Sequence, residues 1–224
     1  SSNWTATKTV TGGHSDGTAA FNIAYTDLAG NSGVAVTSLT AGSGVTVDKS
    51  TPSVTTASIA SNNGSGAELA VPGNIVTLTL VTNENIVEPT VTIATQAATV
   101  SAGADAQNWT AAYTMTENES NGTVPFTIDY ADSAGNTAGT HTALLNDADG
   151  NEVTYDKSKP VLSNVILKSD NSFDSTYAKS GSVVTVSFNS NEALLTSSVA
   201  VTIAGVSRSP SKSSSWDGTK EGWV

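Results

Sequence analysis

Acidic and amide side chains recur in three short motifs, and each motif appears twice in the chain. The first, Asp-x-Ala-Gly-Asn, occupies residues 27–31 and 132–136. The second, Asp-Lys-Ser-x-Pro, follows each copy of the first, and the third, Asn-Glu, lies further along the chain. Carboxylate, amide and backbone oxygens form the hard shell of about six to eight ligands that calcium prefers. The candidate calcium ligands are Asp27, Asn31, Asp48, Glu84, Asp132, Asn136, Asp156 and Glu192.

Turn formation is the competing interpretation of the same motifs. In Asp-x-Ala-Gly-Asn the Asp and Asn side chains can bond to nearby backbone groups, and the Gly accepts a positive φ. Asp48 and Asp156 could equally cap a bend before Ser-x-Pro. Residues 147–152, Asp-Ala-Asp-Gly-Asn-Glu, resemble a short calcium loop but lack the remainder of the EF-hand pattern. Both interpretations therefore stay open at this point.

No residues form a recognisable catalytic set. The chain has no Cys, which excludes disulfides and thiolate metal sites. The two histidines, His14 and His141, have no partner at ligand spacing, and a nearby Ser or Thr means little in a chain rich in both. We therefore expect no enzyme activity and no cofactor other than calcium.

The composition indicates strands and turns in an acidic chain. The 224 residues carry a formal net charge of -11, with 13% charged and 38% hydrophobic residues. Such a chain lacks the basic surface that nucleic acids and anionic membranes attract. No stretch approaches the ~18 apolar residues of a transmembrane helix. We therefore expect neither a nucleic-acid partner nor membrane insertion.

One sequence unit repeats along the chain. Asn-Trp-Thr-Ala at residues 3–6 returns 105 positions later at 108–111, and Phe-x-Ile-x-Tyr at 21–25 returns at 126–130. After the first Asp-Lys-Ser-x-Pro motif the offset is 108. We therefore predict three domains, which are the C-terminal half of one repeat at 1–51, a complete repeat at 52–159, and the N-terminal half of a further repeat at 160–224.

The complete repeat has the pattern of an antiparallel β-sandwich. Short segments with alternating apolar residues are separated by Gly, Asn, Ser and Asp turns, and nothing shows sustained helical periodicity. About seven strands in roughly 107 residues is the size of an immunoglobulin-like domain. We therefore predict an all-β fold of tandem immunoglobulin-like sandwiches, with strands at 54–60, 75–81, 90–94, 109–115, 124–130, 140–145 and 152–155.

Four longer motifs are distributed along the whole chain. They are Asn-Trp-Thr-Ala, Phe-x-Ile-x-Tyr-x-Asp-x-Ala-Gly-Asn, x-Asp-Lys-Ser-x-Pro and Gly-x-x-Val-Thr-Leu-x-Leu-x-x-Asn-Glu. Together they resemble the tandem bacterial immunoglobulin-like repeats of large extracellular adhesins and surface fibre proteins. The resemblance implies a spacer that carries a binding tip away from the cell surface, often stiffened by calcium at its junctions. It also implies an extracellular or cell-surface location, with neighbouring copies of the repeat as partners.

Strand parity predicts where the acidic motifs lie. If seven strands run alternately up and down, the loop after the fifth and the end of the seventh lie at the same end of a module. The Asn-Glu after the second strand of the next module then faces them. Carboxylates packed this closely repel one another, so a bound cation would stabilise the array. One junction thus gathers Asp27, Asn31, Asp48 and Glu84, and the other gathers Asp132, Asn136, Asp156 and Glu192.

A glycan- or surface-binding module of a secreted protein is the alternative function, and it depends on exposed aromatic side chains. Trp4, Trp109 and Trp216 recur at one place per repeat, whereas Trp223 has no clear repeat position. A repeated Trp on an alternating strand is typical of a core, so we expect Trp109 to be buried. A buried Trp109 would remove the sugar-stacking interpretation.

The half modules at 1–51 and 160–224 raise a question of their own, because half a sandwich exposes its core and its strand edges. One interpretation, which we favour, is that these residues are a window of a longer repeat protein. The other is that the last half of one chain completes the first half of another. That arrangement builds a head-to-tail filament by strand complementation.

Overall fold

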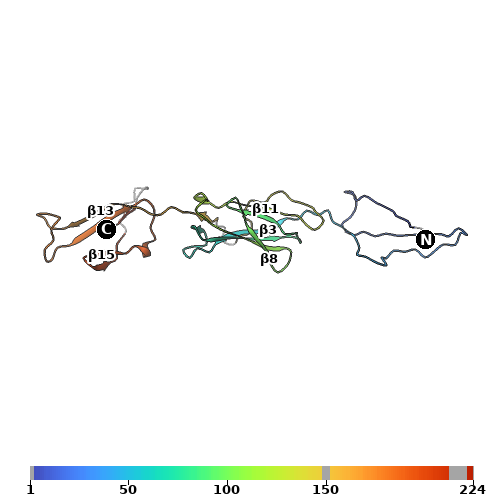
Figure 1. The fold of residues 1–224 in the computed structure, drawn as a ribbon, viewed down its shortest axis with the longest axis horizontal. Coiled ribbons are helices and arrows are strands. Elements are labelled where there is room, and N and C mark those ends of the chain that lie inside the picture. Colours follow the sequence, from blue (N-terminus) through green and yellow to red (C-terminus); the bar gives the residue numbers. More distant parts are fainter. Residues whose placement is uncertain (1–2, 148–151, 212–220, 224) are drawn as a thin grey trace. The chain divides into compact units, whose positions relative to one another are not determined.

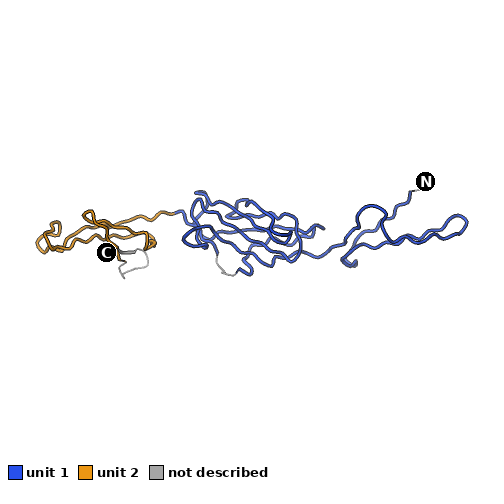
Figure 2. The backbone as a smooth tube through the Cα atoms, turned by 90° about the horizontal axis from the view of Figure 1, so that it is seen from below, with its two compact units in different colours: residues 1–157 blue, residues 158–224 orange. Residues whose placement is uncertain are grey.

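The computed structural model describes residues 3–147, 152–211 and 221–223. It divides into two compact units, Ser1–Lys157 and Ser158–Val224 (Figure 2). In the described ranges the regular structure is β-strand apart from one short 3-10 helix, Thr196–Ser198. The all-β prediction is therefore confirmed. The unit boundary lies two residues before the one predicted at 159, and the boundary predicted at 51 stays a prediction.

A four-stranded antiparallel sheet is the largest element of the first unit (Figure 1). Its strands lie in the order β3 (Val54–Ser61), β5 (Ile75–Thr82), β9 (Asn108–Thr114) and β8 (Thr99–Ala102). Val76, Leu78 and Leu80 alternate with threonine along β5, so these three side chains point to one face of the sheet. That face is buried, and the opposite face, which carries Thr77 and Thr79, is not.

A second sheet packs over this buried face. It consists of β11 (Phe126–Asp129), β6 (Thr90–Ile93) and β7 (Gln96–Ala97), with antiparallel pairs throughout. Side chains from both sheets form one hydrophobic core. Each fully buried aliphatic side chain there contributes about 1.5–3 kcal/mol of transfer free energy. The fully buried aliphatic residues include Val76, Leu78, Leu80, Ile93 and Ile128.

A smaller sheet closes one side of this sandwich. The strand β12 (Thr154–Tyr155) lies between β10 (Gly122–Thr123), to which it is antiparallel, and β4 (Leu69–Ala70), to which it is parallel. Towards the N-terminus, β1 (Gly17–Thr18) pairs with β2 (Thr46–Val47) in the same way that β10 pairs with β12.

The described residues of the second unit form two sheets. In one, β14 (Val184–Ser190) lies between β13 (Leu162–Ser169) and β17 (Glu221–Trp223). In the other, β15 (Val201–Ile203) pairs with β16 (Val206–Arg208). No helix in the described ranges is long and apolar enough to cross a bilayer.

The backbone register corrects one sequence assignment. Trp223 lies opposite Phe188 on β14, as Trp109 lies opposite Leu80 on β5. Trp223 therefore takes the strand position that the sequence comparison had assigned to Trp216, which lies outside the described residues. Trp223 lies seven positions after Trp216 in the sequence.

The strand prediction missed the two-residue strands β4, β7 and β10, and it was also wrong in two longer segments. The strand β8, Thr99–Ala102, was not predicted, because its Thr-Val-Ser-Ala sequence carries only one large apolar side chain. The strand predicted at 140–145 is present only as isolated bridges, from His141 to Ile128 and from Leu145 to Ala57.

Candidate cation site

Three carboxylates meet at one end of the sandwich in the first unit. Asp48 follows β2, Glu84 follows β5 and Asp132 follows β11. One oxygen of each lies within 4.8 Å of the others. A bridge between Ile86 and Asp132 holds the two loops of the sandwich side by side. Residues far apart in sequence thus supply three negative charges to one place.

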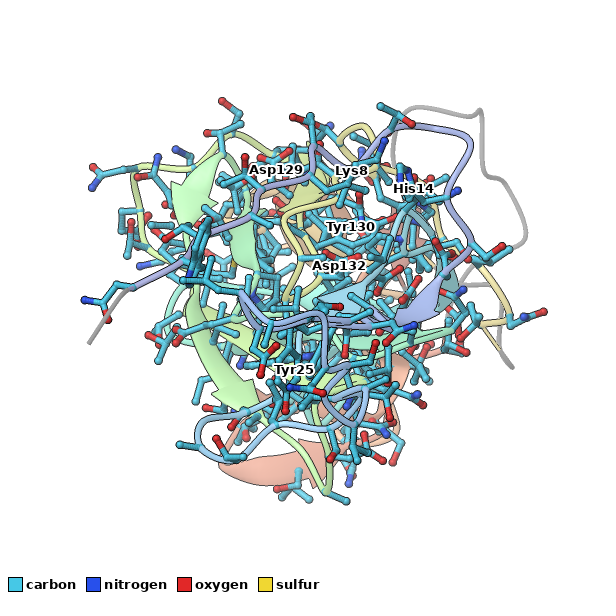
Figure 3. All side chains as sticks on the ribbon, turned by 90° about the vertical axis from the view of Figure 1, so that its right-hand side faces the viewer. Lys8, His14, Tyr25, Asp129, Tyr130 and Asp132 are labelled. Carbon is cyan, nitrogen blue, oxygen red and sulfur yellow. The ribbon has the colours of Figure 1, made fainter. Side chains whose placement is uncertain are left out.

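The loop that begins at Asp132, a residue labelled in Figure 3, is closed by its own hydrogen bonds. The Asp132 Oδ1 accepts hydrogen bonds from the backbone N–H of Ala134 and of Asn136, both at 2.8 Å, and Asn136 Nδ2 donates to Oδ2 at 2.7 Å. The Asn136 side chain first, and then the backbone N–H groups, outweigh burial and lower the pKa of Asp132. The predicted turn chemistry is therefore present, and it keeps a buried aspartate ionised.

The same loop contacts the segment that carries Asp48. Asn136 Nδ2 also lies 3.2 Å from the Asp48 carbonyl oxygen, to which it donates. The Asp48 Oδ1 accepts from the Ser50 backbone N–H at 3.0 Å, which caps the bend before Pro52. Asp48 can therefore cap the bend through Oδ1 and bind a cation through Oδ2, so the two interpretations of this residue are compatible.

Glu84 has the least favourable environment of the three carboxylates. Its Oε1 is buried and has no hydrogen-bond partner among the described residues. Burial raises the pKa of Glu84, and the nearby charges of Asp48, Asp132 and Asp16 raise it further. A buried carboxylate oxygen without a donor is unfavourable unless something positive binds it.

Asp16 is a fourth acidic residue near this group, and the sequence analysis missed it. Its carboxylate accepts from the Lys49 backbone N–H at 3.1 Å and from Ser50 Oγ at 2.9 Å, and it lies 3.9 Å from Lys49 Nζ. The repeat alignment could have found it. Asn121, 105 positions later, makes the corresponding bond to the Lys157 backbone N–H at 3.0 Å.

The structure groups the acidic motifs differently from the strand-parity prediction. Asp132 and Asn136 lie with Asp48 and Glu84, and Asp27 lies outside that cluster. The cause is β8, the strand that was not predicted. This extra strand gives β9 and β11 the opposite direction to the one predicted, so the loop after β11 lies at the other end of the sandwich. The strand β12 is parallel to β4 and still ends where β5 begins.

The remaining predicted ligands lie apart from the carboxylate cluster. Asn31 belongs to the Asp27 loop, where its Nδ2 donates to Asp27 Oδ2 at 2.9 Å. Asp156 lies in the first unit and accepts from Asn121 Nδ2 at 2.9 Å. Glu192 lies in the second unit, and its Oε1 is buried without a partner in the described ranges, as in Glu84. Their role as ligands stays a prediction.

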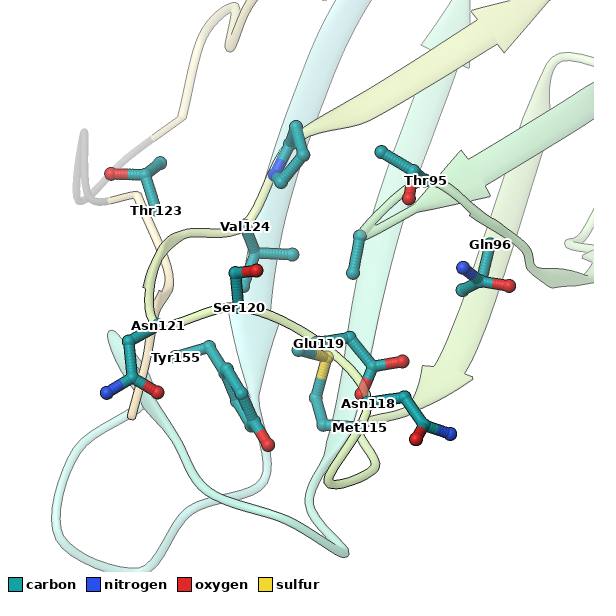
Figure 4. Close-up of a pocket in the computed structure, with 12 residues that line it drawn as sticks. Thr95, Gln96, Met115, Asn118, Glu119, Ser120, Asn121, Thr123, Val124 and Tyr155 are labelled. Carbon is teal, nitrogen blue, oxygen red and sulfur yellow. The ribbon is translucent and has the colours of Figure 1, made fainter. Parts of the chain in front are cut away.

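A pocket of about 340 Å³ lies at the other end of the sandwich, lined by Met115, Glu119 and Tyr155 among others (Figure 4). Glu119 is buried, but its carboxylate accepts from Tyr113 OH at 2.6 Å and from the Thr116 backbone N–H at 2.6 Å. Burial opposes ionisation, yet these bonds prevail and lower the pKa of Glu119. The carboxylate closes the 116–119 turn.

The two histidines are engaged in local turns. The Thr11 backbone N–H donates to His14 Nδ1 at 2.9 Å. In the equivalent turn, 105 residues later, the Thr116 backbone N–H donates to Glu119. His141 Nε2 lies 2.7 Å from the Ala143 carbonyl oxygen. Residues 148–151 of the other proposed calcium loop lie outside the described residues.

Comparisons of the chain with protein-family models, with curated proteins and with solved structures find no match.

Proposed function

We propose that this chain is a structural spacer of a long extracellular adhesin or surface filament. It is built from tandem immunoglobulin-like β-sandwiches whose junction is stiffened by calcium. The observation that carries the proposal is the group formed by Asp48, Glu84 and Asp132. It joins the segment that enters the sandwich to two loops at the end of that sandwich.

The donor set fits calcium. One oxygen of each of three carboxylates lies within 4.8 Å of the others, and these are hard oxygen ligands. Among the described residues, the Oε1 of Glu84 has no hydrogen-bond donor, so a cation would supply the positive charge that it lacks. Asp48, Glu84 and Asp132 would hold the ion. The bound ion supplies positive charge that offsets the repulsion between these groups, and the segment at Asp48 is then tied to the sandwich.

The hydrogen bonds at the two Asp-Lys-Ser-x-Pro segments support the tandem arrangement. Lys49 Nζ donates to the Gly12 carbonyl oxygen at 3.1 Å, and Lys157 Nζ donates to the Glu117 carbonyl oxygen at 2.8 Å. These contacts fold each segment back onto the part of the chain that precedes it. A lysine contact that recurs in both segments suits a spacer, because a spacer needs an ordered chain at every junction.

The glycan-binding alternative loses its principal residue. Trp109 is only 9% exposed, and its Nε1 donates to the Ala106 carbonyl oxygen at 3.0 Å. An indole in this position stabilises the core and presents no face on which a sugar could stack.

Thermal unfolding with and without calcium tests the proposal. At a calcium concentration about 100-fold above Kd, binding to the folded state adds about 2.7 kcal/mol, which raises the midpoint by roughly 10 °C. The variant Asp48→Asn/Glu84→Gln should lose this shift, and Glu117→Gln, which removes an exposed carboxylate elsewhere, should keep it. An unchanged midpoint in the parent protein removes calcium from the proposed function.

A further inference from the structure

Two Asn-Gly pairs occur in the sequence, at residues 63–64 and 121–122, and both lie in the sandwich. An asparagine before glycine loses its side-chain amide readily, because glycine has no side chain to hinder attack of its backbone nitrogen on the asparagine Cγ. The first pair lies in the turn between β3 and β4, and the second lies at the start of β10. The two pairs thus share one chemistry in different backbone surroundings.

The backbone nitrogen of Gly64 is available for this attack. Gly64 is exposed and lies outside every strand, and its N–H donates to no acceptor among the described residues. A Cβ placed on Gly64 would meet no atom within 4 Å beyond its chain neighbours, so the space around it is open. The attacking nitrogen is therefore neither hydrogen-bonded nor covered.

The side chain of Asn63 folds back toward that nitrogen. Its Oδ1 accepts a hydrogen bond from the Ser65 backbone N–H at 2.8 Å, which turns the side chain over the intervening peptide. The same N–H stabilises the oxygen on which negative charge develops when a nitrogen adds to Cγ. The Asn63 Nδ2 donates to Asn74 Oδ1 at 3.1 Å, and this second bond fixes the amide.

The backbone nitrogen of Gly122 is held in a sheet. Gly122 lies opposite Tyr155 in the antiparallel pair of β10 and β12. Two residues further on, the Val124 N–H donates to the Val153 carbonyl oxygen at 2.8 Å. Hydrogen-bonded pairs alternate along such a ladder, so the Gly122 N–H is directed at the Tyr155 carbonyl oxygen. Attack on the Cγ of Asn121 therefore requires β10 to open.

We propose that Asn63 is a site of spontaneous deamidation in the folded protein and that the fold protects Asn121. The Gly64 nitrogen forms a bond to Asn63 Cγ, the bond from Cγ to Nδ2 breaks, and the proton of the Gly64 N–H leaves with Nδ2 as ammonia. Water then opens the succinimide ring at one of its two carbonyl groups and gives aspartate or isoaspartate. Water is the only co-reactant. The proposal does not depend on the proposed function.

The new carboxylate loses the hydrogen bond that joins two loops. Asn74 Oδ1, which accepts from the Asn63 amide, also accepts from the Val71 backbone N–H at 2.8 Å. The Asn74 amide therefore cannot turn its nitrogen toward position 63 without giving up that bond, and the carboxylate faces an oxygen. Deamidation should loosen the 62–66 loop against the 71–75 segment, and the change accumulates as the protein ages.

Peptide mapping of the whole protein after incubation at pH 8 tests the proposal. Cleavage after glutamate separates the two sites, because Glu68 and Glu119 lie between them. By mass spectrometry, Asn63 should change from an amide to a carboxyl group about tenfold faster than Asn121, because only Asn121 must wait for a strand to open. In urea the two should react at similar rates. Equal rates in the folded protein overturn the proposal, and so does an Asn63 that reacts only in urea.

Gly64→Ala is the matched control. A methyl group there hinders attack on Cγ, and it fits because the space is open and the φ of Gly64 lies outside the left-handed region. The variant should melt like the parent and lose the modification, and modification at the parent's rate overturns the proposed attack by this nitrogen. Asn63→Asp, which has one of the two products at position 63, should melt below the parent. An equal midpoint overturns the predicted loosening of the loop.

Discussion

The loops at 27–31 and 132–136 have the same internal hydrogen bonds in different surroundings. In both, the aspartate Oδ1 accepts from the backbone N–H of the final asparagine at 2.8 Å, and the asparagine side chain bonds to Oδ2. Asp27 is exposed, whereas Asp132 is 4% exposed and lies beside Glu84. The loop conformation is therefore local, and only its place in the sandwich makes Asp132 a candidate ligand.

The segments before these loops differ in the same manner. A bridge joins Ile23 to Val36, and an equivalent bridge joins Ile128 to His141. The backbone is thus locally alike, but Ile128 is fully buried and Ile23 is about half exposed. The contrast shows that the local pairing forms in both segments, whereas burial of the isoleucine requires the hydrophobic core of the sandwich.

The largest expected effect is the loss of a core side chain. Ile128→Ala should reduce the free energy of unfolding by about 2–5 kcal/mol, because it leaves a cavity between the two sheets. Ile23→Ala in dilute protein should change it by less than about 0.5 kcal/mol, since that side chain is half exposed. Denaturant unfolding measures both. Equal losses would show that the two strands are buried alike in solution.

The turn at 116–119 should show the next largest effect. Glu119→Ala removes an acceptor from Tyr113 and Thr116 inside a buried site, which should cost about 1–3 kcal/mol. His14→Ala, at the equivalent exposed turn, should cost less than about 0.5 kcal/mol. The same denaturant experiment compares the two, and a larger loss at His14 would contradict the assignment of the 11–14 turn as exposed.

The Glu84→Gln variant should lose the part of the pH dependence of calcium-free protein that comes from Glu84. Because the folded-state pKa of Glu84 is raised above the ordinary value of 4.5, its favourable contribution is present below that pH. It is lost as the pH rises through the folded-state pKa. Without calcium at neutral pH, Glu84→Gln should therefore melt higher than the parent.

Calcium should remove that advantage, because the ion favours ionised Glu84. Melting curves in chelator and in calcium between pH 4 and 8 measure both effects. A variant that melts lower than the parent in chelator would show that Glu84 is not repelled by its neighbours.

The smallest effect is expected from the two aspartates of the loops. The pKa of Asp27 and that of Asp132 are both lowered from 3.8, chiefly by the asparagine side chains. Each therefore adds stability above that pH, which is lost as the pH falls through the folded-state pKa. In Asp27→Asn and in Asp132→Asn, the free energy of unfolding should fall slightly less than in the parent as the pH is lowered. Only Asp132→Asn should reduce the rise in unfolding midpoint that calcium causes. An equal reduction in both variants would show that the two loops do not differ in calcium binding.

Local sequence determined much of this protein. The alternation of Val and Leu with Thr in β5 predicted its buried face, and Asp-x-Ala-Gly-Asn predicted the turn, because side-chain periodicity and short-range hydrogen bonds depend only on neighbouring residues. The repeat predicted that Trp109 is buried. The same repeat aligns Asp16 with Asn121, but the sequence analysis did not use this correspondence.

Only the tertiary structure decided which acidic residues meet. Counting strands placed the Asp132 loop at the wrong end, because Thr99–Ala102 pairs with β9 through its backbone and carries little apolar signal. A site whose ligands come from three distant segments depends on the direction of every strand between them. The sequence contains those ligands, but strand pairing selects Asp48, Glu84 and Asp132 from the eight candidates.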